Sequence, residues 1–230
     1  MMRAMVLRVS LAETEVVDDP ALRDLLDDAE RARADRKRAP SPFVTAHAHV
    51  RRVLGDLLGV DPSSLAFDRH CPTCGSTQHG KPTIVGHPQW SYSLSYTDAL
   101  AVVAVAQGPT LGVDVEHVTE ADFGGFAQVT LAPEEADGFA GHEGEALLAA
   151  RAQVWARKEA ILKATGHGLV VDPTEVVVTG PDEAPALVDW RAREERPTAV
   201  TLADVVLRCP DHRASVAALT DEPVEVVTLP

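Results

Sequence analysis

The sequence predicts a mixed α+β fold, in which short strands and amphipathic helices alternate along 230 residues. Two observations predict it. The apolar runs YSLSY at 92–96 and LAVVAVA at 100–106 are separated by a short polar turn, which is typical of a β-hairpin. Apolar residues at helical spacing occupy 43–58 and about 143–165, and a glycine follows each stretch. Because no low-complexity linker interrupts the chain, we expect one large domain or two closely packed halves.

The first half of the chain is expected to begin with a strand at 3–12. Asp19-Pro20 then opens a helix, since proline is favoured in the first helical turn. An amphipathic helix at 43–58 stops at Gly59, and residues 68–89 are expected to form a loop because they are rich in Gly, Pro, His and Cys. The hairpin completes this half.

The second half is expected to open with a strand at 111–118, after the turn at 107–110. A helix starts at Pro133, and the long helix over about 143–165 follows. Four later segments have the composition of strands: 174–179, 186–190, 199–208 and 213–219.

Composition and charge exclude several classes of protein. A hydrophobic content of 45% is enough for a substantial core. The net charge of −14 argues against a general nucleic-acid binder, which would carry a basic surplus. The longest apolar run is too short to cross a bilayer, and the N-terminal residues lack the pattern of a signal peptide. We therefore expect a cytoplasmic protein that does not enter a membrane.

Lysine is rare in this chain, which has 17 Arg and only four Lys. Two of the four, Lys158 and Lys163, fall within WARKEAILKATG at 155–166, with Glu159 between them. A chain that otherwise uses Arg has no compositional reason to place Lys here. The segment is therefore a candidate for chemistry that needs a compact ammonium group.

Asp114 and Glu116 form a pair of carboxylates on the strand at 111–118. Alternation along a strand places both on one face, with Val113 and Val115 pointing into the core on the other. Adjacent carboxylates repel each other unless a cation lies between them. The alternative is an exposed face of an edge strand, where the pair has no function.

Glu159 supplies a third carboxylate from the long helix. It shares a stripe with Trp155, which marks the side expected to be buried, and a buried carboxylate needs a partner or a metal. Three oxygen ligands with open positions describe a site for Mg²⁺, whose shell commonly includes substrate phosphate. Lys158 and Lys163 would then neutralise phosphate charge. The alternative is a surface helix with a Glu159–Lys163 salt bridge.

Other segments give weaker signals. Lys81 follows a glycine in HGKP at 79–82, and Ser95 belongs to alternating serines on a strand. Residues 30–52 carry seven basic and two acidic side chains, so they form either a solvated face or an anion-binding patch. Cys71 and Cys74 resemble half of a zinc site, although a plain loop is the alternative.

Four segments together resemble the Sfp-type 4′-phosphopantetheinyl transferases, of the holo-acyl-carrier-protein synthase superfamily. They are HGKP at 79–82, SLSY at 93–96, GVDVE at 112–116 and WARKEAILKATGHGL at 155–169. The resemblance implies two similar α+β halves related by a pseudo-twofold, each a small antiparallel sheet packed on a long helix, with the active site in the cleft between them. Residues 1–109 would form the coenzyme A nucleotide side, and 110–230 the metal side.

The resemblance also implies a reaction and its residues. The 4′-phosphopantetheine arm of coenzyme A would move to a serine of an apo acyl or peptidyl carrier protein, releasing 3′,5′-ADP. Asp114, Glu116 and Glu159 would hold Mg²⁺, with Mn²⁺ as the alternative, and the catalytic set would be Glu159, Lys163 and Asp114. The implied coenzyme A contacts are Lys81, Pro82, Ser95, Tyr96, Lys158 and Lys163, with Arg36, Arg38 and Arg51 as candidates for the 3′-phosphate.

Tyr96 departs from the family pattern, in which a histidine is usual. The tyrosine hydroxyl can donate a hydrogen bond but carries no positive charge, so the replacement is expected to weaken the contact with coenzyme A. Two other functions remain open from the residues alone: a Mg²⁺-dependent nuclease or phosphodiesterase, and a non-catalytic module that binds coenzyme A or a carrier protein. The resemblance implies a monomer that binds no nucleic acid.

Overall fold

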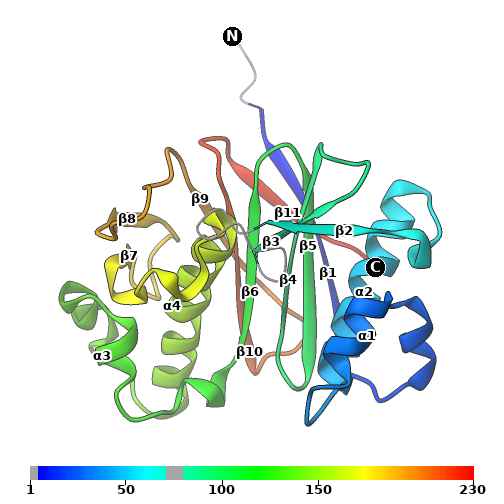
Figure 1. Ribbon diagram of the computed structural model, residues 1–230. Coiled ribbons are helices and arrows are strands. Elements are labelled where there is room, and N and C mark those ends of the chain that lie inside the picture. The colour runs from blue at the N-terminus through cyan, green and yellow to red at the C-terminus, as the bar shows by residue number, and fades with distance from the viewer. Residues whose placement is uncertain (1–4, 71–79) are drawn as a thin grey trace.

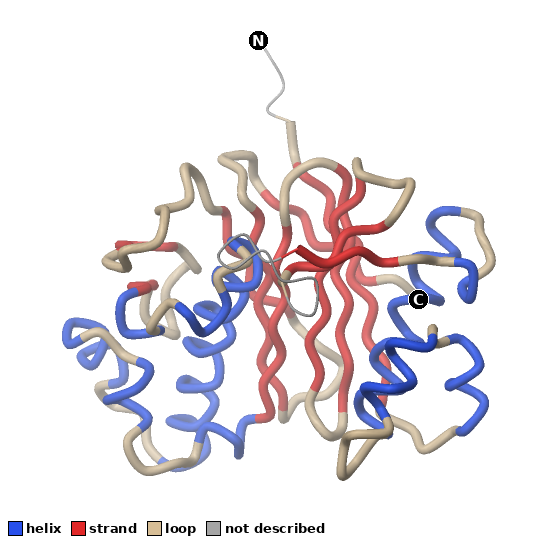
Figure 2. The backbone as a smooth tube through the Cα atoms, viewed as in Figure 1, coloured by secondary structure: helices blue, strands red, loops and turns tan. Residues whose placement is uncertain are grey.

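Strands occupy the centre of the molecule and helices flank them on both sides, as Figures 1 and 2 show. The computed structural model describes residues 5–70 and 80–230. The expected mixture of helices and strands is confirmed. Within the described ranges no helix is both long and apolar enough to cross a membrane.

The first of the two larger sheets has the strand order β11-β1-β5-β4. Its strands are β1 (Leu7–Glu15), β4 (Trp90–Tyr96), β5 (Leu100–Gln107) and β11 (Val224–Thr228). Strands β1 and β11 are parallel, whereas β5 pairs antiparallel with both β1 and β4. Helix α2 (Ser41–Leu58) packs its apolar side on β4 and β5, and it ends at Gly59 with the left-handed backbone that glycine adopts readily.

The second sheet has the order β6-β10-β9 and carries the long helix α4 (Gly144–Thr165). Its strands are β6 (Leu111–His117), β9 (Thr201–Val205) and β10 (His212–Ala218). The apolar faces of both sheets meet in one core, to which β6 contributes Val113 and Val115 as its alternation predicts. The even-numbered residues of β6 consequently face α4.

Shorter elements complete the chain. They are η1 (Pro20–Leu25), α1 (Asp28–Ala34), η2 (Pro62–Ser64), β2 (Phe67–His70), β3 (Lys81–Ile84), η3 (Val118–Ala121), α3 (Phe126–Thr130), η4 (Pro133–Phe139), η5 (Gly168–Val170), η6 (Pro173–Glu175), β7 (Val176–Val178) and β8 (Leu187–Trp190). Strands β2 and β3 pair with each other, as do β7 and β8.

Strands β4 and β6 are edge strands of the two sheets and are joined through serine side chains. The Ser91 hydroxyl accepts the Leu111 N–H at 3.1 Å, and the Ser93 hydroxyl accepts the Val113 N–H at 3.0 Å. The alternating serines therefore replace the backbone carbonyls that a continuous ladder would use. Figure 1 shows the two strands running beside each other in the middle of the molecule.

Gly112 lets α4 lie directly on β6. A Cβ atom at this position would come within 1.9 Å of the Ala160 carbonyl oxygen and 2.5 Å of the Ala164 nitrogen. Such distances are far inside van der Waals contact, so only glycine permits this packing. The contact fixes the height at which α4 presents its side chains to β6.

Three expectations about secondary structure were wrong or incomplete. The helix expected after Asp19-Pro20 is divided into η1 and α1, because Asp27 caps a new helix by accepting the Glu30 N–H at 2.8 Å. Part of the expected 68–89 loop is the β2–β3 pair. Strand β11 was not expected at all. The division at 109/110 and the pseudo-twofold remain predictions.

Candidate functional site

A cavity of about 670 Å³ lies where β6, α4 and the β4–β5 turn meet. Asp114, Glu116 and Glu159 all line it, together with Lys163 and Trp155. The structure therefore brings together the three carboxylates on which the sequence analysis focused. Because Asp114 is only 2% exposed, the alternative of a solvated edge strand is excluded for this residue.

The two carboxylate oxygens of Asp114 differ: one accepts hydrogen bonds, and the other has no partner among the described residues. Its Oδ1 accepts hydrogen bonds from the Ser95 hydroxyl at 2.8 Å and from the Lys163 ammonium at 2.5 Å. Its Oδ2 is buried and has no hydrogen-bond partner among the described residues. A buried oxygen of this kind is costly unless something else satisfies it.

Glu159 repeats the pattern from α4, since its buried Oε1 also lacks a partner among the described residues. Burial, reinforced by the neighbouring Asp114, raises the pKa of Glu159 to about 7. Burial is also the main cause that raises the pKa of Glu116, again with Asp114 second. Without a cation, the protein thus favours protons on carboxylates that would otherwise be ionised.

The donor set fits a hard divalent cation. It consists of carboxylate oxygens only, two of which are buried without partners, and it borders a cavity with room for water and phosphate oxygens. A cation bound to either oxygen would satisfy it, and its charge would offset the repulsion from Asp114 that adds to burial in raising the pKa values of Glu159 and Glu116.

The two lysines of α4 have different environments. Lys163 lines the cavity and also donates to the Ser95 hydroxyl at 2.8 Å. Lys158, by contrast, is 0% exposed and points elsewhere, donating to Glu135 Oε2 at 2.6 Å and to the Pro173 carbonyl at 3.0 Å. The expectation that Lys158 reaches substrate phosphate does not agree with this position, because its ammonium is enclosed by protein acceptors.

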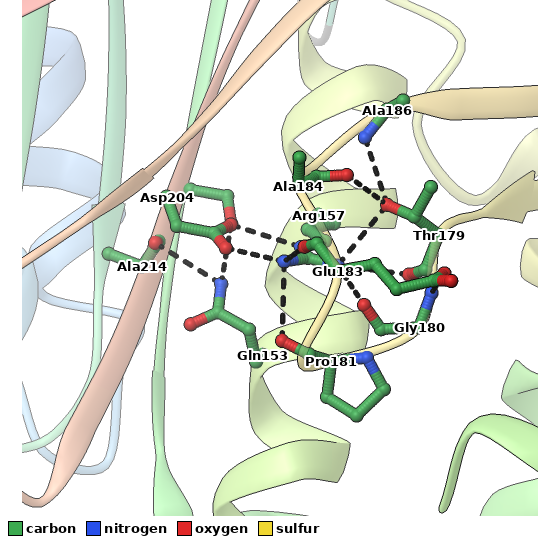
Figure 3. Close-up of polar contacts among 11 residues, drawn as sticks. Gln153, Arg157, Thr179, Gly180, Pro181, Glu183, Ala184, Ala186, Asp204 and Ala214 are labelled. Carbon is green, nitrogen blue, oxygen red and sulfur yellow. Dashed lines mark hydrogen bonds and ion pairs between the residues drawn. The ribbon is translucent and has the colours of Figure 1, made fainter.

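Arg157 anchors α4 against the strands behind it, as Figure 3 shows. Its guanidinium donates to Asp204 Oδ1 at 3.0 Å and to the Thr179 and Gly180 carbonyls at 2.9 and 2.6 Å. Gln153 and Asp204 extend the same network toward β10. These contacts hold the helix in the position that delivers Glu159 to the cavity.

A second cavity, of about 680 Å³, adjoins the first and shares Tyr96, Lys163 and Leu169 with it. Its wall includes Arg33, Arg69, Lys81 and Pro82, with Phe43 and Tyr92 as apolar surface. Sequence reasoning missed Arg33 and Arg69. The signal for Arg33 was present in the basic 30–52 run, but nothing in the sequence marked Arg69.

The remaining expected contacts lie at varying distances from this cavity. Lys81 lines it, but its ammonium donates to the carbonyls of Leu111 and Lys163, and burial lowers its pKa to about 7. Arg36 and Arg38 are exposed and lie outside the set of residues that line it. The expectation that Arg51 holds the 3′-phosphate is wrong, because its side chain is 0% exposed and is ion-paired with Glu30 at 2.8 Å.

The possible zinc ligands Cys71 and Cys74 lie outside the described residues. The expectation for them therefore stays a prediction.

Comparison with known proteins agrees with this site. Residues 110–217 match the family model of the 4′-phosphopantetheinyl transferase superfamily. The 4′-phosphopantetheinyl transferase HetI of Nostoc sp. is 29% identical over 167 residues, which are 69% of this chain and 68% of the relative. The L-aminoadipate-semialdehyde dehydrogenase-phosphopantetheinyl transferase of Eremothecium gossypii is 33% identical over 187 residues, which are 73% of this chain and 62% of the relative.

The matched region contains β6, α4 and all three carboxylates. The chain is therefore similar, over residues 110–217, to the 4′-phosphopantetheinyl transferase superfamily, and the relatives are named as phosphopantetheinyl transferases. It spans about two thirds of the length of these relatives, 62% of one and 68% of the other. Both findings favour the transferase over the nuclease and over the non-catalytic module.

Proposed function

We propose that this chain transfers the 4′-phosphopantetheine arm of coenzyme A to a serine of an apo acyl or peptidyl carrier protein. In this reaction the serine oxygen forms a bond to the phosphorus nearest the pantetheine, the phosphorus–oxygen bond of the pyrophosphate breaks, and 3′,5′-ADP leaves. The observation that carries the proposal is the pair of buried oxygens on Asp114 and Glu159 that have no hydrogen-bond partner among the described residues, in two residues that line a cavity inside the matched region.

The two adjoining cavities support a placement for coenzyme A. The second cavity offers aromatic surface and the guanidinium groups of Arg33 and Arg69, which suit a nucleotide with its phosphates. Lys163 and Tyr96 line both cavities, so they suit the pyrophosphate between them. The first cavity is then left for the serine of the carrier protein.

Asp114, Glu116 and Glu159 would hold Mg²⁺, or Mn²⁺ in its place. When bound, the cation would offset the negative charge of the pyrophosphate and of the departing 3′,5′-ADP. The Lys163 ammonium already contacts Asp114 Oδ1, which leaves Oδ2 for the cation.

Glu159 is the proposed base for the serine proton. Its position on the cavity wall supports contact with the incoming hydroxyl, directly or through a water molecule.

Intact-protein mass spectrometry tests the proposal. An apo carrier protein incubated with this chain, coenzyme A and Mg²⁺ should gain the mass of one phosphopantetheine arm, and EDTA should abolish the gain. Glu159→Gln should abolish the transfer, because the base and one metal ligand are lost. The matched control is Glu145→Gln, an exposed glutamate on the same helix.

Each result has a defined meaning. Transfer by the Glu159 variant at the wild-type rate over a Mg²⁺ titration would contradict the assigned base and ligand. Absence of transfer to acyl and peptidyl carriers by a folded wild-type chain would contradict the proposed reaction.

A further inference from the structure

His117 and His212 face each other at one end of the second sheet. They are directly opposed partners in the β6–β10 pairing, and their rings are 4.8 Å apart and nearly perpendicular. Asp211 lies between them, with Oδ2 3.2 Å from His117 Nε2 and Oδ1 2.8 Å from His212 Nδ1. One ligand atom from each residue lies within 4.8 Å of the other two. Three potential metal ligands therefore lie close together, with Asp211 between the two rings.

The outer nitrogen of each ring is held by a threonine. His212 Nε2 is 3.1 Å from the Thr97 hydroxyl, and His117 Nδ1 is 2.7 Å from the Thr119 hydroxyl. The Thr97 hydroxyl already accepts the N–H groups of Ala99 and Leu100, so it donates to His212 Nε2, and His117 Nδ1 accepts the Thr119 N–H at 3.3 Å. The inner nitrogens, His212 Nδ1 and His117 Nε2, therefore carry the ring protons and donate to Asp211 in the metal-free chain. A cation bound here would displace these two protons, and the threonine contacts would orient the rings.

The cluster is distinct from the carboxylate cavity. Alternation along β6 places His117 on the opposite face from Asp114 and Glu116, although His117, Thr97 and Thr119 also line that cavity. The ligand types differ as well. Imidazole nitrogens select borderline transition metals, whereas carboxylate oxygens alone suit Mg²⁺.

Exposure of the cluster provides a route for an ion. The His212 side chain is 2% exposed, but those of His117 and Asp211 are 27% and 60% exposed. An ion could enter from the Asp211 side and keep a water molecule as its remaining ligand, as zinc does when a protein supplies three ligands.

We propose that His117, Asp211 and His212 form a second metal site, which takes a borderline divalent transition-metal cation of the Zn²⁺ or Co²⁺ type. The ion would join the end of β6 to the start of β10. This proposal is independent of the proposed transfer reaction, because it rests on ligands of the opposite face and is measured without substrate.

Co²⁺ titration of the full chain tests the site, since the visible absorption of Co²⁺ reports tetrahedral coordination. The background variant is Cys71→Ser with Cys74→Ser, which removes the thiolates, and Mg²⁺ is kept in excess to occupy the carboxylates. We expect saturable binding of one equivalent that Zn²⁺ displaces. Asp211→Asn, at the most exposed ligand, should abolish the signal without unfolding the chain.

Two further variants make the test specific. Thr97→Val removes the contact behind His212 and should weaken Co²⁺ binding by roughly 10–100-fold. His142→Ala is the matched control, because His142 has the same 3.2 Å contact to an aspartate, Asp182, as His117 has to Asp211. It should bind Co²⁺ as the background does. No saturable binding in the background variant, or binding that Asp211→Asn leaves unchanged, would overturn the proposal.

Discussion

Replacing Lys158 with methionine separates a structural lysine from a catalytic one. Methionine keeps most of the aliphatic chain and removes the ammonium. In the structure that ammonium is fully buried and donates to Glu135 Oε2 at 2.6 Å and to the Pro173 carbonyl at 3.0 Å. Glu135 is itself only 7% exposed, so Lys158→Met leaves a buried carboxylate without its counter-charge.

The expected cost is large. Removing one partner of a buried ion pair costs about 3–5 kcal/mol, which is a large share of the roughly 5–15 kcal/mol that stabilises a domain. Glu135 would keep two backbone donors, the N–H groups of Ala132 and Val178 at 2.7 and 2.8 Å, which limits the loss. Glu135→Gln removes the stranded charge, so the double variant should recover part of the stability.

Urea unfolding of the wild type, Lys158→Met and the double variant measures these differences. We expect a lowered midpoint for Lys158→Met, partial recovery in the double variant, and activity that follows the folded fraction. A different result would refute the reasoning: a wild-type midpoint together with lost transfer would mean that Lys158 contacts substrate. Lys163→Met is the comparison: it also leaves a buried carboxylate, Asp114, without its counter-charge, so its midpoint should fall too, but its transfer should be lost even in the folded fraction.

Three other outcomes are expected. Gly112→Ala should yield little folded protein, measured by circular dichroism of the soluble fraction, because its Cβ would lie 1.9 Å from the Ala160 oxygen. Raised pKa values mean that folded Glu116 and Glu159 bind protons more tightly than they do in the unfolded chain. The stability that these two groups contribute to the metal-free chain should therefore be fully present below their ordinary pKa of 4.5 and be lost as pH rises through the raised values, about 7 for Glu159. Thermal melts should show that Mg²⁺ restores stability above neutrality, and no Mg²⁺ effect would contradict the site. Tyr96→His should leave transfer equal or faster in coenzyme A titrations, because it adds a cationic donor beside both cavities; a marked loss would contradict this.

Local patterns predicted the elements that carry the site. Alternation along β6 correctly assigned Asp114 and Val113 to opposite faces, and helical spacing correctly placed Glu159 and Lys163 on one side of α4. Each of these inferences depends only on neighbours along the chain. They succeeded because strand and helix periods are fixed by backbone geometry.

Contacts between distant segments could not be predicted in this way. Arginine usually lies on the surface, yet Arg51 is buried because it forms ion pairs with Asp27 and Glu30 at the start of α1. Lys158 looked equivalent to Lys163 in the sequence. Because the two lysines are five residues apart, Lys158 points to a different side of the helix from Lys163, and there it forms an ion pair with Glu135. Strand β11 was missed because its segment VEVVT is short and forms a strand by pairing with β1, which is distant in the sequence.

The serine contacts between β4 and β6 determine which internal displacement is easiest for this molecule. Sliding strands within either sheet breaks a run of peptide hydrogen bonds. Shear between β4 and β6 stretches three serine hydroxyl contacts, made by Ser91, Ser93 and Ser95, and each hydroxyl can follow by rotation about a single side-chain torsion. Ser95 and Tyr96 belong to one side of this boundary and Asp114 to the other. The width of the carboxylate cavity therefore depends on the serine contacts between β4 and β6, which deform more easily than the hydrogen-bonded sheet on either side.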